Sequence, residues 1–373
     1  MFHLNPALFL LILTLILSFL RQHIFLKYTG RRRTVADFRT ATSFLHESDL
    51  ESRAKANRHL RDAFGILNPF VNGEKDFHDK YVKCVRRQLL HVTSDWSAVV
   101  DCAKSAAKEF DETNSVDRIR DGIRLIVMSI ALKIIGVDGY STDELLRVGQ
   151  LINLIWLQAK SGGSTLILRN ELHAVLQRWK HDDFIDALIK TSNVSKECAI
   201  LSILIPAYET MYRVVLPLIF HAHNKVSFER FLDPDVSIAT LNSTATFTSI
   251  CEESYTYLAL VQETLRRYPV VKRIKRATSW EITAVDIAAI HLNATTWDAP
   301  EDFQPMRWMK LGKESGYMPF GAGRGRCIAN EGIVGLIVCI VLGVIEKPLR
   351  NFKTGDLNAL LSNDREIQNE MLR

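Results

Sequence analysis

The residues with the most specific chemistry lie in one loop, Phe320-Gly321-Ala322-Gly323-Arg324-Gly325-Arg326-Cys327-Ile328-Ala329. Three glycines within five positions let the backbone turn tightly and approach a flat ligand closely. An apolar run follows from Gly332 to Ile345, so we expect Cys327 near a helix N-terminus, where a thiolate is stabilised. Arg324 and Arg326 add positive charge. A thiolate on such a backbone is what an axial ligand to haem iron requires.

The same loop fits two plainer interpretations, a phosphate site or a simple turn before a helix. No Lys-Ser/Thr pair follows, as a P-loop would require, and no strand–GxGxxG–helix unit surrounds it. The spacing within the loop therefore does not by itself distinguish a haem ligand from a simple turn or a phosphate site, and other motifs are needed.

An acid and a hydroxyl interrupt an otherwise apolar helix expected over Ala199–Phe220, as Pro206-Ala207-Tyr208-Glu209-Thr210. A proline inside a helix removes a hydrogen bond and kinks it. Either this is a buried helix whose polar face meets water, or a kinked helix lines a pocket with Glu209 and Thr210 directed inward.

Four further charged residues stand out by their spacing. Glu263 and Arg266 stand three apart on an expected helix that ends near Pro269, so they share a face and can pair. Arg307 lies in Phe303-Gln304-Pro305-Met306-Arg307-Trp308, and Arg276 lies between the two segments. An isolated E-x-x-R is a weak signal, and Arg276 among other basic residues also fits an ordinary surface.

The elements that must position these residues are mostly helices. Val35 to Gly136 shows helical spacing, with a stop predicted at Gly65, and Thr142–Gln158 is a further helix with Thr142 or Asp143 as its cap.

The chain has 373 residues, 47% of them hydrophobic, which is enough for a large core. Its net charge of +5 is spread along the chain, which argues against nucleic acid as a partner. Six scattered cysteines without a C-x-x-C pair indicate reduced thiols rather than a disulfide framework or a zinc site.

The N-terminus predicts a membrane anchor. Leu4 to Leu20 is apolar, and the first basic residues follow it, beginning with Arg21. We expect residues 1–26 to form a single transmembrane helix and residues 27–373 to form one cytosolic domain. A cleaved signal peptide would have a basic start and a small-residue cleavage site, and neither is evident.

Taken in order, the motifs at Ala207–Thr210, Glu263/Arg266, Phe303–Trp308 and Phe320–Ala329 resemble those of cytochromes P450, most closely the fungal microsomal members of secondary metabolism. The resemblance implies a mainly α-helical fold with a small β region, and haem b (iron protoporphyrin IX) ligated by Cys327 in a loop that includes Phe320 and Gly323. It implies that Glu263 and Arg266 hold Arg307, and that Arg276 contacts the haem propionates. Thr210 and Glu209 would deliver protons during dioxygen cleavage.

The implied function is oxidation of a lipophilic small molecule, such as a terpenoid, polyketide or alkaloid precursor. Electrons would come from an NADPH–cytochrome P450 reductase at the endoplasmic reticulum membrane, docking on a basic face near Cys327.

Several departures from the family pattern qualify this. The chain is shorter than typical microsomal members, and part of a β-hairpin is missing between Thr278 and Ala284. Gly325 stands two residues before the cysteine, where the family often has a propionate-binding arginine, and Arg324 or Arg326 is expected to substitute. Ala329 replaces the common glycine, and no tryptophan–arginine pair occurs over His78–Arg87. A truncated, catalytically impaired haem protein is therefore an alternative, as is a membrane-tethered helical interaction protein without haem.

Overall fold

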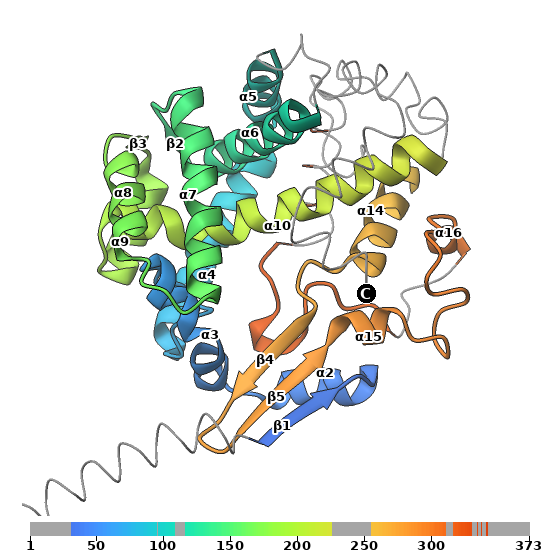
Figure 1. Ribbon diagram of the computed structural model, residues 1–373. Helices are drawn as coiled ribbons and strands as arrows, with labels where there is room; N and C mark the ends of the chain where they lie inside the picture. The colour runs from blue at the N-terminus through green and yellow to red at the C-terminus, as the bar shows by residue number, and fades with distance from the viewer. Residues whose placement is uncertain are drawn as a thin grey trace, which may run out of the picture.

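The structure is a computed structural model that describes residues 31–94, 96–108, 116–225, 255–310 and 316–329, with Val334, Ile337 and Val341 (Figure 1). The expected membrane anchor, residues 1–26, lies outside the described residues, as does most of the apolar run after the cysteine loop. Most of the described chain is helical: α2 (Phe38–Glu47), α3 (Leu50–Phe64), α4 (Lys75–Ser94), α5 (Ser97–Lys108), α6 (Val116–Ile134), α7 (Thr142–Lys160), α8 (Leu166–Leu176), α9 (Asp183–Ser192), α10 (Lys196–Lys225), α14 (Tyr255–Arg267), α15 (Ile287–His291) and α16 (Arg307–Lys310), with a 3₁₀ turn η2 (Gly323–Gly325).

The small β region is a three-stranded sheet in the order β1-β5-β4, from β1 (Arg31–Val35), β4 (Arg273–Ala277) and β5 (Glu281–Asp286). β1 runs parallel to β5, and β4 is antiparallel to β5 across a tight turn closed by Thr278 N–H donating to the Glu281 carbonyl at 2.9 Å. This short turn agrees with the shortened hairpin expected between Thr278 and Ala284. A separate ribbon pairs β2 (Val137–Asp138) with β3 (Lys180–His181).

Two helix ends show how local sequence decides these boundaries. Gly65 follows α3 with φ of 70°, a left-handed conformation that favours glycine, so the predicted stop is confirmed. The predicted cap of α7 is wrong by one residue, because Ser141 is the N-cap. Its hydroxyl accepts from Glu144 N–H while the Glu144 carboxylate accepts from Ser141 N–H, and only this reciprocal pair satisfies two exposed donors at once.

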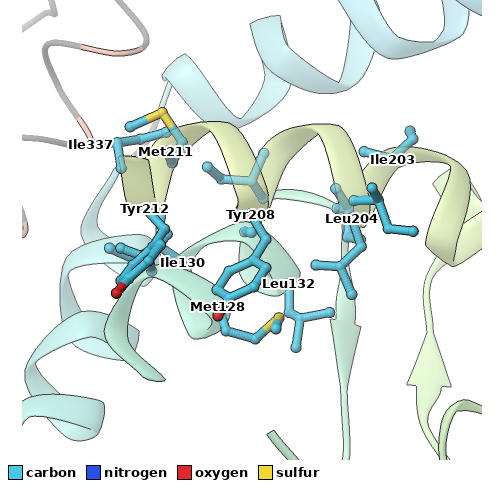
Figure 2. Close-up of a cluster of buried hydrophobic side chains, with 14 of the residues drawn as sticks. Met128, Ile130, Leu132, Ile203, Leu204, Tyr208, Met211, Tyr212 and Ile337 are labelled. Carbon is cyan, nitrogen blue, oxygen red and sulfur yellow. The ribbon is translucent and has the colours of Figure 1, made fainter. Parts of the chain in front are cut away.

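Helix α10 crosses the molecule and carries the core (Figure 1). Tyr208 and Tyr212 point from α10 toward α6, where Ile130 and Leu132 lie, while Met211 points to the side on which Ile337 lies (Figure 2). Within the described residues, Lys196–Leu218 is the one helical stretch long and apolar enough to cross a membrane, but 67% of its most apolar window is buried inside the protein. That burial is typical of a core helix.

Pro206 interrupts the hydrogen-bond ladder of α10, and residues from other segments supply the missing hydrogen-bond donors. Proline has no N–H, so the Ser202 carbonyl, four residues earlier, lacks its helical donor. Asn68 Nδ2 donates to that carbonyl at 2.8 Å and Tyr81 Oη at 3.3 Å. The Ser202 hydroxyl also accepts from Leu67 N–H at 2.9 Å. The segment after α3 is therefore hydrogen-bonded to α10 just before Pro206.

Candidate active site

The cysteine loop depends on two glycines with left-handed backbones, Gly321 (φ 70°) and Gly323 (φ 68°). The loop closes through Cys327 N–H, which donates to the Phe320 carbonyl at 2.9 Å. A side chain at Gly323 would collide with the backbone of Leu45 and His46 in α2, so glycine is required there for two reasons. This packing holds Phe320 and Cys327 at opposite ends of one tight turn.

The Cys327 side chain is reachable by solvent, yet it lies deep among protein atoms, and this burial raises the pKa of the thiol. The backbone N–H groups of Ala329 and Ile328 and the charge of Arg326 act in the opposite direction and favour the thiolate. Donors directed at a sulfur are the arrangement that suits an anionic metal ligand. The expected helix dipole behind Cys327 falls outside the described residues.

A cavity of about 740 Å³ opens between the cysteine loop and α4. Its lining includes five cationic side chains, two of them the loop arginines. From α4 it takes His78, Asp79, Val82, Lys83, Arg86, Arg87 and Leu90, and from the loop Gly323, Arg324, Arg326 and Cys327. Arg324 and Arg326 are both exposed, which places them on the outer, basic side of the loop.

Glu263, Arg266 and Arg307 come together in the interior. The Glu263 carboxylate accepts from Arg266 Nε at 2.9 Å and Nη2 at 2.8 Å, and from Arg307 Nε at 3.3 Å. It also accepts from Gln304 N–H at 2.8 Å and Trp308 Nε1 at 2.9 Å. The E-x-x-R motif is thus a buried network rather than the solvated surface pair that spacing alone allowed.

His291 links this network to the chain that enters the cysteine loop. Arg266 Nη1 donates to the His291 carbonyl at 2.9 Å, and the His291 ring lies 3.2 Å from the Arg266 carbonyl through Nδ1. Its Nε2 accepts from Met318 N–H at 3.0 Å. Burial lowers the pKa of His291 to about 4, so the ring is neutral and Nδ1 carries the proton. Sequence reasoning missed this residue, because no motif marks it.

Glu209 and Thr210 lie half-buried on the turn of α10 that follows Pro206. The Thr210 hydroxyl donates to the Pro206 carbonyl at 2.5 Å, and Glu209 Oε2 lies 3.1 Å from Arg213 Nη2. The turn of α10 after Pro206 therefore carries a carboxylate beside a hydroxyl whose oxygen can still accept a hydrogen bond.

Arg276, on β4, is buried and meets a second arginine that the sequence reasoning missed. Arg276 Nε donates to Ser48 Oγ at 3.0 Å, and its Nη1 donates to the Lys275 carbonyl at 3.0 Å. Arg53, on α3, is 4% exposed, and its Nε and Nη2 have no hydrogen-bond partner among the described residues. Burial first, and then the charge of Arg276, lower the pKa of Arg53 to about 10. The available signal was an arginine at helical spacing with Leu50 and Ala54, on the buried face of α3.

These residues fit both the iron and the propionate carboxylates of a haem group. Cys327 offers a sulfur directed by backbone N–H groups, and the buried arginines offer unused donors for a carboxylate. Haem carries both an iron that takes a thiolate ligand and propionate carboxylates.

Comparison with known proteins agrees with this reading. The family model described as "Cytochrome P450" matches residues 242–330. A steroid (22S)-hydroxylase of Oryza sativa subsp. indica is 26% identical over 179 residues, 41% of this chain and 35% of the relative. A cholesterol 22-monohydroxylase of Trigonella foenum-graecum is 26% identical over 216 residues, 47% of this chain and 44% of the relative. The matches thus span less than half the length of these relatives.

The fold extends the likeness over most of the chain. A zebra fish cytochrome P450 structure with progesterone matches with a TM-score of 0.63 at 16% identity, covering 86% of each chain. A zebra fish cytochrome P450 structure with abiraterone matches with a TM-score of 0.60 at 15% identity, covering 90% of this chain and 91% of that one. The family model thus runs through both arginine motifs and the cysteine loop, and the fold around them is that of solved cytochromes P450.

Proposed function

We propose that this protein is a haem-thiolate monooxygenase that oxidises a lipophilic small molecule. One oxygen atom of dioxygen enters the substrate and the other leaves as water, with two electrons derived from NADPH and two protons. A haem b held by Cys327 would supply the activation of dioxygen, because a thiolate ligand donates electron density that favours O–O cleavage. The remaining steps are tasks for the protein: holding the thiolate, delivering protons and excluding water.

The observation that carries the proposal is the environment of Cys327. Three features act together: a loop tied by Cys327 N–H to Phe320, N–H groups of Ile328 and Ala329 directed at the sulfur, and the positive charge of Arg326. A buried thiol without a metal would keep its proton, since burial alone raises its pKa. The donors are therefore explained by a ligand that requires the thiolate form.

Spectroscopy tests the ligand directly. The reduced, carbon-monoxide-bound protein should show the red-shifted Soret band of a thiolate ligand, and Cys327→Ala should abolish it. Cys84→Ala, which removes a half-buried thiol on α4, is the matched control and should keep the band. An unchanged spectrum in Cys327→Ala would reject the assignment.

Thr210 and Glu209 are proposed to deliver protons. The Thr210 hydroxyl is anchored to the Pro206 carbonyl, so its oxygen is held in place and can accept a hydrogen bond from a water. Glu209, beside it and paired with Arg213, is placed to exchange protons with solvent through such a water.

An NADPH–cytochrome P450 reductase is proposed to dock over the basic cavity beside α4. Lys83, Arg86 and Arg87 face the loop arginines across that cavity, close to Cys327. Such a surface attracts an acidic partner, and the attraction weakens with salt. Lys83→Glu with Arg87→Glu should slow reductase-driven reduction about tenfold at low ionic strength. Lys108→Glu, an exposed charge on α5, should not, and equal effects from both would place the docking surface elsewhere.

The substrate class is proposed from the apolar character of α10 and from the two relatives, which are named as steroid and cholesterol hydroxylases. A role in secondary metabolism remains a proposal that metabolite comparison after gene deletion would test.

We also propose that residues 1–26 anchor the protein in the endoplasmic reticulum membrane with residues 27–373 in the cytosol. Deletion of residues 1–26 should then release the protein from the membrane fraction. The alternative, an impaired haem protein, would give the thiolate spectrum but consume NADPH only to form peroxide.

A further inference from the structure

Aromatic side chains form a continuous series beside the cysteine loop. The Tyr317 ring centroid lies 4.6 Å from that of Trp308, and the Trp308 centroid lies 5.4 Å from that of Trp297. These separations are those of aromatic rings in direct contact. Tyr317 stands three residues before Phe320, whose carbonyl accepts from Cys327 N–H at 2.9 Å. A short path of bonds and ring contacts therefore leads from the Cys327 sulfur to the two tryptophans.

The two tryptophans differ in what their indole N–H groups contact. Trp308 Nε1 donates to Glu263 Oε2 at 2.9 Å, so a carboxylate lies within reach of its proton. Trp297 Nε1 is buried and has no hydrogen-bond partner among the described residues. An indole that loses an electron becomes strongly acidic, and its oxidation is favoured where the proton can leave. Within the part of the chain that the structure describes, Trp308 has an acceptor for that proton and Trp297 does not.

Positive charge also distinguishes the two indole rings. The guanidinium carbons of Arg266 and Arg307 lie 5.3 Å and 6.0 Å from the Trp297 ring centroid. A cation over a ring face is attracted by the ring electrons, and removing one of these electrons turns the attraction into repulsion. Since Trp297 is 2% exposed, water screens this repulsion little. Trp297 is therefore difficult to oxidise, whereas the carboxylate beside Trp308 favours the loss of an electron.

We propose that Trp308 is an oxidative modification site, at which oxidising equivalents leave the haem through Tyr317 when no substrate reacts with them. The inference rests on the proposed haem binding.

The electrons and atoms of this reaction balance. Hydrogen peroxide takes up two electrons and two protons at the haem, and its O–O bond breaks to give water. Trp308 supplies both electrons through Tyr317, one after the other, and its indole N–H proton passes to Glu263. Solvent water then forms a C–O bond with the oxidised ring and releases the second proton. One hydrogen peroxide and one tryptophan thus give one hydroxytryptophan and one water.

Peroxide treatment of the hemin-loaded full-length protein tests the assignment, under argon and in water labelled with heavy oxygen, with peptide mass spectrometry as the readout. Trp308 should gain one labelled oxygen atom, because the added oxygen comes from solvent. Trp297, in contact with it, should stay unmodified. Trp280 is 72% exposed and reports oxidants that diffuse through the solution, so Trp308 should be modified before it. Unlabelled oxygen on Trp308, or earlier modification of Trp280 or Trp297, would overturn the proposal.

Two variants separate the electron path from the fold. Tyr317→Phe leaves the pair of Trp308 and Glu263 in place but replaces the phenol by a ring that is far harder to oxidise, so the labelled product at Trp308 should be lost. Trp308→Phe removes the final electron donor, so its haem should bleach faster in peroxide, measured as the loss of Soret absorbance. Trp297→Phe is the matched control and should behave as the wild type does in both measurements. Undiminished labelling in Tyr317→Phe, or unchanged bleaching in Trp308→Phe, would reject the path.

The haem-free protein gives an independent readout. Without haem, the same peroxide treatment should leave Trp308 unmodified. Equal modification would show that peroxide reaches the ring directly, and would overturn the proposal. If the wild type showed the thiolate spectrum but Trp308 gained no oxygen, only this inference would fail. If the wild type bound no hemin, the proposed function would fail with it.

Discussion

Removing the Glu263 carboxylate should destabilise this protein more than any surface change. Glu263 is fully buried, and its carboxylate accepts from Arg266, Arg307, the Gln304 N–H and the Trp308 indole. In Glu263→Ala, the two arginines keep their charges but lose their counterion. Breaking a buried ion pair on one side costs about 3–5 kcal/mol.

The neutral donors add to this loss. The Gln304 N–H and the Trp308 indole would each lose an acceptor, at about 1–3 kcal/mol apiece when buried. Before relaxation these losses amount to about 5–11 kcal/mol, which is comparable with the whole stability of many domains, about 5–15 kcal/mol. We expect Glu263→Ala to be largely unfolded, and Glu263→Gln, which keeps one acceptor oxygen, to fall between it and the wild type.

Urea unfolding followed by far-ultraviolet circular dichroism, in detergent, measures the change in free energy of unfolding. Glu301→Ala is the matched control, because Glu301 pairs with the neighbouring Arg267 at 2.7 Å but is 67% exposed. Exposed pairs contribute less than about 1 kcal/mol, so this variant should unfold as the wild type does. If Glu263→Ala also stayed within about 1 kcal/mol of the wild type, the network would not hold the fold together.

Three further outcomes are expected. Thr210→Ala should keep haem binding while product formation falls about a hundredfold and hydrogen peroxide is released, as general acid assistance is lost; unchanged coupling would move the proton path elsewhere. Because burial lowers the pKa of His291 to about 4, the unfolded chain binds a proton below about pH 6.5 that the folded chain excludes. Stability should therefore fall by about 2 kcal/mol between pH 7 and 5, and His291→Gln should lose this dependence in urea titrations. Gly323→Ala should abolish the thiolate spectrum, because its side chain meets the backbone of α2, whereas Gly162→Ala, equally left-handed but in open space, should keep it.

The parts of the site set by local sequence were predictable. Gly65 ends α3 as expected because only its own backbone conformation decides the position. Glu263 and Arg266 share a helix, so their pairing follows from their spacing, and the resemblance added Arg307. The cap at Ser141 was missed because three polar residues compete there, and only the reciprocal bond with Glu144 selects one.

Features that depend on distant segments could not be predicted. Arg53 and Arg276 belong to different elements, and no pattern within either segment indicates that they meet at Gly325. The same holds for Asn68 and Tyr81, whose donors reach the Ser202 carbonyl of α10. Sequence shows that Pro206 removes a hydrogen bond, but only the folded chain shows what replaces it.

That replacement has a consequence for the order of folding. A helix without proline can complete its hydrogen bonds alone, but the Ser202 carbonyl obtains its donors only after Asn68 and Tyr81 have docked. The central helix and the segment between α3 and α4 should therefore form in one cooperative step. In native-state hydrogen exchange, the Leu67 amide, bonded to the Ser202 hydroxyl, should open with the same free energy as the amides around Ser202. Because Pro206 removes one donor, the longest helix of the described chain depends on one of its earliest segments.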